Sequence, residues 1–198
     1  MTRTSVAVLG TLTEFHDDPI PYDLSTLIDL VKNINPDLLC LDMTMDQWQA
    51  QDFSHLPPEY RDALLPLAYQ TDIVVAPIAG KLPLEKINVT GWRGFLIRQI
   101  RRVLNWMQQT APGPDAMNQG WRHHWGNSLY NIIRKLAGIQ IQQSYHEHIE
   151  ALTQAVMKVT ENNPGNRILV VTNIQYCHHI RPRLRQLSDV QVTTYTDL

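Results

Sequence analysis

Four short apolar runs in the chain have the pattern of buried β-strands. They span residues 5–9, 37–41, 72–78 and 167–172. Apolar residues follow one another in these runs without regular polar alternation, which is typical of strands covered on both faces. A fifth run, residues 190–195, alternates apolar and polar side chains, so we expect it at an edge of the sheet.

Helical segments separate the first three of these strands. Asp23 or Ser25 can cap a helix that carries apolar residues on one face and stops before Pro36. A second helix is predicted for residues 59–69, with a kink at Pro66. Strands that alternate with helices favour parallel pairing. The fold class is therefore α/β, with a mostly parallel central sheet of about five strands and flanking helices.

A long helical insertion is expected before the late strand, at about residues 91–161. Trp92, Leu96, Ile100, Val103 and Met107 recur at helical spacing, and four arginines occupy the other faces of the same segment. Residues 116–126 show no clear period and are predicted to form a loop or lid. The helical pattern returns from Asn127 to about Thr160, and Gly138 is expected to bend or split it.

Length and composition indicate one globular domain over residues 1–198. The chain is 43% apolar and 18% charged, which is ordinary for a core-forming protein. No window approaches the roughly 18 apolar residues of a membrane span, and the first residues lack a signal-peptide pattern. We therefore expect a soluble, cytoplasmic protein without membrane contact. The two cysteines offer little for a disulfide or a thiolate zinc site.

The small net charge of −2 conceals a strong asymmetry. Residues 1–90 carry 13 acids against 5 bases, whereas residues 91–198 carry 12 bases against 6 acids. Either ion pairs join the two halves, or the arginines form an anion-binding face. The pI of about 6.4 argues against nucleic-acid binding as the main role.

Two distant segments end in similar polar residues. The strand at residues 5–9 leads to His16, and the strand at residues 167–172 leads to His178 and His179. Ligands of α/β proteins are held at the carboxyl ends of the strands, so we expect the functional site where these two ends meet. Asp42, which directly follows the buried run 37–41, is expected at the same edge of the sheet.

Acid and imidazole groups in one crevice suit two kinds of chemistry. Asp42 can act as a general base or a metal ligand, or it can simply cap the next segment. His16, Asp42 and His178 form a sensible composite set for a divalent metal, although hydrogen-bonded loop and cap residues would give the same pattern. Phosphate-binding glycine motifs and a serine nucleophile elbow are absent from the sequence.

The order of features resembles a superfamily that contains TraB-like proteins, ChaN-like haem-binding proteins, TIKI metalloproteases and erythromycin esterases. The resemblance rests on a first strand ending in Gly10-Thr, on Pro36-Asp-Leu-Leu-Cys-Leu-Asp42, on a long helical middle and on the late strand before a short helix. It implies an α/β fold and, for the enzymes, two Gly-x-x-His motifs with an acid after the second strand. Thr13 and Gln175 stand where the motif histidines are expected, so only Asp42 matches.

Three functions remain open. In the first, a small hydrolase uses Asp42 with His16 and His178 or His179, directly or on a metal, while Arg181 or Arg183 steadies the substrate. In the second, a non-catalytic protein holds a ligand or haem in the same crevice through Tyr176, Cys177 or the histidine pair, and Trp121 and Trp125 close over it. Thr13 and Gln175 are also expected at this site. In the third, the arginine-rich helix is a face for a homo-oligomer or another partner.

Overall fold

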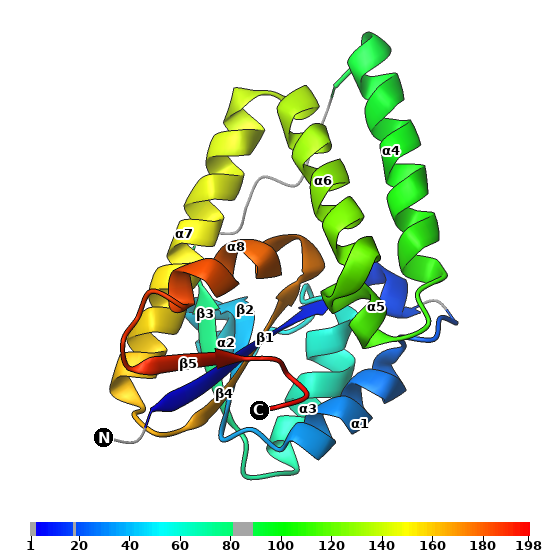
Figure 1. The fold of residues 1–198 in the computed structure, drawn as a ribbon. Helices are drawn as coiled ribbons and strands as arrows, with labels where there is room; N and C mark the ends of the chain where they lie inside the picture. Colours follow the sequence, from blue (N-terminus) through cyan, green and yellow to red (C-terminus); the bar gives the residue numbers. More distant parts are fainter. Residues whose placement is uncertain (1–2, 18, 81–88) are drawn as a thin grey trace.

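The structure is a computed structural model that describes residues 3–17, 19–80 and 89–198, and its centre is a five-stranded sheet (Figure 1). The strands are β1 (Thr4–Thr11), β2 (Leu38–Thr44), β3 (Val74–Ala79), β4 (Arg167–Asn173) and β5 (Val190–Thr193). Their order is β3-β2-β4-β1-β5, and every neighbouring pair is parallel. The predicted α/β class and the predicted edge position of the last strand are confirmed.

Helices cover both faces of the sheet. One face packs against α1 (Leu24–Ile34), the wide π-type helix η2 (Glu59–Leu64) and α3 (Leu65–Tyr69). The other face packs against α7 (Ile139–Asn162) and α8 (Ile174–Leu184). On β1, Ala7 and Leu9 face the first layer, while Val6 and Val8 face the second. Both faces are apolar, which explains the continuous apolar runs of the sequence.

Local signals set several helix boundaries. The Asp23 side chain accepts a hydrogen bond from the Thr26 N–H and caps α1, as expected. Pro66 lies in the first turn of α3, where its missing N–H is tolerated, so the predicted helix 59–69 consists of two pieces. The short elements η1 (Thr13–Asp17) and α2 (Met45–Ala50) directly follow β1 and β2.

A group of long helices stands away from the sheet (Figure 1). It consists of α4 (Gly91–Gln109), α6 (Gly120–Ala137) and the upper part of α7, with the short α5 (Pro114–Asn118) at its base. Helix α6 contacts both α4 and α7. A small apolar core made by Ile97, Ile100, Leu104 and Ile133 joins α4 to α6.

The prediction of a loop or lid at residues 116–126 is wrong, because α5 and α6 contain nearly all of it. The helical period is broken at Gln119, which is extended, and at Gly120, which has a φ of 73°. Trp121 and Trp125 are exposed on α6, so they gave no apolar periodicity. Gly138 separates α6 from α7 with a φ of 104°, which confirms the predicted split.

The carboxyl ends of the two similar segments meet, as expected. Gly10 pairs with Thr172 and Thr11 with Asn173 in the parallel ladder between β1 and β4. Strand β2 lies on the other side of β4, with Leu41 opposite Val171. The next residue of β2, Asp42, is therefore placed beside Thr172, at the centre of the sheet's carboxyl edge.

Candidate functional site

A cavity of about 550 Å³ opens at the carboxyl ends of β1, β2 and β4, beneath the long helices. Its lining contains groups of both charges and several aromatic rings. The polar and aromatic residues nearest to the strand ends are Thr13, Asp42, Glu59, Tyr60, Tyr145, His148, Asn173, Gln175 and Tyr176. The cavity therefore lies where ligands of α/β proteins are usually held.

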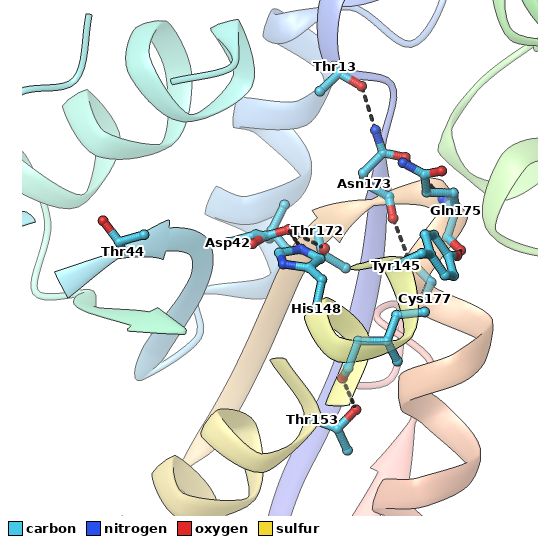
Figure 2. Close-up of polar contacts among 12 residues, drawn as sticks. Thr13, Asp42, Thr44, Tyr145, His148, Thr153, Thr172, Asn173, Gln175 and Cys177 are labelled. Carbon is cyan, nitrogen blue, oxygen red and sulfur yellow. Dashed lines mark hydrogen bonds and ion pairs between the residues drawn. The ribbon is translucent and has the colours of Figure 1, made fainter. Parts of the chain in front are cut away.

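Two side chains contact the same carboxylate oxygen of Asp42 (Figure 2). Its Oδ2 accepts a hydrogen bond from the Thr172 hydroxyl at 3.2 Å and lies 3.2 Å from Nε2 of His148. The other oxygen, Oδ1, is buried and has no hydrogen-bond partner among the described residues. A carboxylate oriented in this way offers Oδ1 as an acceptor for a proton or a ligand group.

His148 was not among the residues expected at the site. It lies on the face of α7 that packs on the sheet with Ile149, Leu152 and Val156, and only 2% of its surface is exposed. Its ring lies 4.9 Å from that of Tyr176. The apolar period of this helix includes Tyr145 and Leu152, which are three residues before and four after His148, so the helical spacing contains the signal that places His148 on the inner face.

Hydrogen bonds between loop ends fix the rim of the cavity. Asn173 Nδ2 donates to the Thr13 hydroxyl at 2.7 Å, and Asn173 Oδ1 accepts from the Gln175 N–H at 3.1 Å (Figure 2). The Tyr145 hydroxyl donates to the Gln175 carbonyl at 2.5 Å. Thr13, Gln175 and Tyr176, which we expected to contact a ligand, all line the cavity.

A second carboxylate, Glu59, lines the floor of the cavity and was not predicted there. It is 1% exposed and accepts a hydrogen bond from the Thr11 hydroxyl at 2.7 Å. The neighbouring Tyr60 donates its hydroxyl to the Val171 carbonyl at 3.0 Å. Burial raises the pKa of Tyr60 well above its usual value, and the charges of Asp42 and Glu59 add to this, so Tyr60 is a neutral donor.

His16 lies apart from the cavity lining. Its Nε2 accepts the Leu12 N–H at 3.1 Å, and its ring packs edge-on against Tyr22 at 5.1 Å. The His16 ring therefore stabilises the turn at η1, which is a structural role. Among the described residues, no three His, Cys, Asp or Glu side chains converge as a metal would require, so His16, Asp42 and His178 do not meet.

His178 and His179 lie on α8 and do not line the cavity. Their ring centres are 3.8 Å apart, with His178 against His123 and His179 against Tyr145. Burial lowers the pKa of His178 to about 3 and that of His179 to about 4, and nearby positive charges add to both shifts. Both rings are therefore neutral at neutral pH.

The two arginines expected to steady a substrate make protein contacts instead. Arg181 donates to the Val8 carbonyl at 2.7 Å and to the Asn118 carbonyl at 3.1 Å. Arg183 pairs with Glu150 at 2.5 Å. The arginines of the second half therefore do not bridge to the acids of the first half among the described ion pairs. The contact of His148 with Asp42, which is an ion pair only when the imidazole is protonated, joins the halves.

The residues expected to hold haem do not gather around the cavity. Tyr176 lines it, whereas Cys177 is fully buried and its Sγ lies 3.7 Å from the Asn173 carbonyl. Burial raises the pKa of Cys177 to about 11, so the thiol is protonated at neutral pH. Trp121 and Trp125 are 58% and 62% exposed on α6 and do not line the cavity. This set does not fit an iron ligand sphere.

The arginine-rich helix α4 has an exposed apolar stripe besides its buried face. Trp92, Phe95, Val103 and Trp106 lie on this stripe, each at least 47% exposed. Arg101 of the same helix lines the cavity. The hypothesis that this helix is a partner face stays a prediction.

Comparison with protein-family models, with curated protein sequences and with solved structures found no match. Within the part of the chain that the structure describes, no helix has both the length and the apolarity to cross a bilayer.

Proposed function

We propose that the protein is a hydrolase for a small molecule and that Asp42 is its general base. The observation that carries this proposal is the arrangement of Asp42, which lines the cavity at the sheet's carboxyl edge. One of its carboxylate oxygens is held by His148 and Thr172, and the other is buried without a partner among the described residues. A base needs a fixed orientation and a lone pair that no other protein group occupies, and among the described residues this carboxylate has both.

The reaction class that suits these groups is hydrolysis of an ester by water. A water molecule hydrogen-bonded to Oδ1 transfers a proton to Asp42 while its oxygen attacks the ester carbonyl carbon. When the bond to the leaving alkoxide breaks, the alkoxide takes that proton and Asp42 is regenerated. His148 is a positioning residue in this scheme, since it acts through Asp42. It takes the place that we had expected for His16, His178 and His179.

The position of Asp42 also supports the resemblance to the TraB-like and ChaN-like superfamily, in which the enzymes carry an acid after the second strand. We include membership of that superfamily in the proposal. Thr13 and Gln175 stand at the two motif positions, and no three His, Cys, Asp or Glu side chains in the described part of the chain are placed to hold a metal, so no step is assigned to a metal.

The test is hydrolysis of 4-nitrophenyl esters by the purified protein and by the variant D42N. We expect turnover by the wild type and a fall in kcat/KM of about 100-fold or more in D42N, the usual size for loss of a general base. The matched control is D46N, because Asp46 is an exposed aspartate on the following helix. Equal rates for D42N and the wild type would refute the role of Asp42.

The second candidate, a non-catalytic binding protein, uses the same cavity. It is favoured by the wall of aromatic rings beside Asp42, where Tyr176 lies 5.3 Å from Tyr145 and 4.9 Å from His148. Absence of wild-type turnover over ester, thioester, amide and phosphoester probes, together with saturable ligand binding, would select this function instead.

A further inference from the structure

Arg134 is a buried cation that lines the cavity and has no carboxylate partner among the described residues. It lies on α6 and is 8% exposed, and it is the one arginine that is buried in the described part of the chain. Its Nη2 donates to the Asn131 side chain, whereas Nη1 has no hydrogen-bond partner among the described residues. Such a group is unusual, because buried charges in proteins are normally paired.

The aromatic ring of Tyr145 holds the guanidinium in place. The Cζ atom of Arg134 lies 3.8 Å from the centre of this ring, and the Tyr145 hydroxyl is itself anchored on the Gln175 carbonyl. A ring face stabilises a cation without using its N–H groups. The contact therefore holds the guanidinium at the cavity wall, while Nη1 keeps no hydrogen-bond partner among the described residues.

Arg134 and Asp42 lie along one continuous wall of the cavity. Asp42 is paired with His148, whose ring contacts Tyr176; the Tyr176 ring contacts Tyr145, and Tyr145 carries Arg134 on its face. All five side chains line the same cavity. A ligand that lies against the two tyrosine rings can thus reach the carboxylate with one end and the guanidinium with the other.

Other arginines do not offer the same site. Arg181 and Arg183 are engaged by main-chain carbonyls and by Glu150. Arg101, which also lines the cavity, is exposed on α4 and is therefore hydrated when no ligand is present. Arginine keeps its charge at neutral pH even when burial lowers its pKa, as it does for Arg134.

We propose that Arg134 binds an anionic oxygen group, a carboxylate or a phosphate, of the molecule whose reacting bond lies at Asp42. The guanidinium fork matches the paired oxygens of both groups. The substrate class is then a small acidic ester with its anionic group and its scissile bond at opposite ends. This assignment of a substrate rests on the proposed function, whereas the anion site itself does not.

The first experiment measures anion binding by calorimetry with benzoate, inorganic phosphate and neutral benzamide as probes. We expect the wild type to bind one of the two anions and not benzamide. The anion that binds more tightly shows whether the anionic group of the ligand is a carboxylate or a phosphate. R134M should weaken binding at least about tenfold, which is the effect of losing a charged hydrogen bond. R98M, which removes an exposed arginine of α4, should bind as the wild type does.

Thermal unfolding separates a ligand site from a structural role. Replacing an unpaired buried cation by an apolar side chain of similar length should leave the melting temperature of R134M unchanged or higher. Saturating anion should raise the melting temperature of the wild type and not that of R134M. A large fall in the melting temperature of the unliganded variant would show that the fold requires Arg134, and that result would overturn the proposal.

The variant D42N distinguishes failure of this proposal from failure of the proposed function. It should bind the anion at least as tightly as the wild type does, because among the described residues Asp42 is paired with His148 and Thr172 and not with Arg134. If turnover is found, R134M should raise KM at least about tenfold for 4-nitrophenyl hemisuccinate and leave KM for 4-nitrophenyl acetate unchanged. Equal anion affinity of R134M and the wild type, or no anion binding by the wild type, would refute the site.

Discussion

Gly10 and Asn118 exchange two hydrogen bonds in the interior of the protein. The Gly10 N–H donates to Asn118 Oδ1 at 2.6 Å, and Asn118 Nδ2 donates to the Gly10 carbonyl at 3.0 Å. The reason lies in the sheet, because β5 pairs with β1 only from Thr4 to Ala7. Beyond that point the outer edge of β1 has no strand partner in the described ranges, and the amide of Asn118 hydrogen-bonds the Gly10 main chain as a strand would. The Arg181 side chain likewise donates a hydrogen bond to the Val8 carbonyl of this edge.

Replacement of Asn118 should therefore destabilise the fold strongly. N118A leaves the buried Gly10 N–H without its acceptor and removes one of the two donors to the Gly10 carbonyl, which keeps the Tyr22 hydroxyl at 3.2 Å. It should lower the free energy of unfolding by about 2 kcal/mol. Urea denaturation monitored by circular dichroism measures this change. N33A, at an exposed position of α1, is the matched control and should stay within about 0.5 kcal/mol of the wild type. A similar small change for N118A would contradict the edge-capping role.

Gly10 is also a point of close approach between β1 and α8. A Cβ atom at this position would lie 2.4 Å from Cδ1 of Ile174 and 2.9 Å from its Cα, so main chain as well as side chain would have to shift. G10A should cost roughly 1–3 kcal/mol of stability, as overpacked core positions do. Because α8 carries Gln175 and Tyr176, a displacement of this helix should also weaken any ligand affinity of the cavity.

Gly126 provides the control for this substitution. It lies inside α6, and a Cβ there would meet no atom within 4 Å. G126A should be neutral or should raise stability by up to about 1 kcal/mol, since alanine is the better helix former. If the two variants changed the unfolding midpoint alike, close approach of β1 and α8 would not be the reason that position 10 is glycine.

The fold could be predicted from the sequence because each buried strand has its signal within its own residues. The apolar run at residues 37–41 indicates a strand covered on both faces, and the structure has β2 there. The helices at residues 116–126 could not be predicted in this way. Their aromatic residues Trp121 and Trp125 face solvent, and Gln119 interrupts the helical path, so no apolar period exists to detect.

The site could be predicted only in part for a similar reason. Asp42 takes its place from the strand that precedes it, whereas His148 takes its place from the packing of a helix 106 residues later in the chain. His16 follows a strand as Asp42 does, yet the tight turn of η1 directs its ring to the Leu12 N–H. The position of a residue relative to a strand end therefore predicts which edge of the sheet it lies at. The local turn then decides whether its side chain enters the cavity.

The neutral pair His178 and His179 should make stability depend on pH. Their pKa values are lowered to about 3 and about 4 in the folded protein, against 6.5 for ordinary histidine. As the pH falls below about 6.5, the unfolded chain takes up protons that the folded chain does not, so the free energy of unfolding decreases. Each group contributes at most about 1.4 kcal/mol per pH unit, and less here because solvent partly screens half-buried rings.

Denaturation midpoints measured between about pH 7 and pH 4 test this dependence, within the window set by the two pKa values. The double variant H178N/H179N should show a flatter profile than the wild type over this range. H124N removes an exposed histidine of the neighbouring helix and should keep the wild-type slope. The opposite result, an unchanged slope in the double variant, would show that these two rings are not the groups that the folded state keeps neutral.

The pair of His148 and Asp42 predicts a difference between two substitutions of the same histidine. H148F leaves the Asp42 carboxylate without one of its two donors in a buried site, and should lower the free energy of unfolding by about 3 kcal/mol. H148Q retains an N–H donor that can reach Oδ2, so its free energy of unfolding should fall by only about 1 kcal/mol.

In the background of D42N, H148F should lower the free energy of unfolding by less than it does alone, because the charge that needs the donor is gone. Urea denaturation of the three single variants and the double variant D42N/H148F gives these values, and kcat with an active ester should fall in the same order. If H148Q and H148F lose equal activity while only H148F loses stability, then His148 itself transfers the proton and Asp42 orients it.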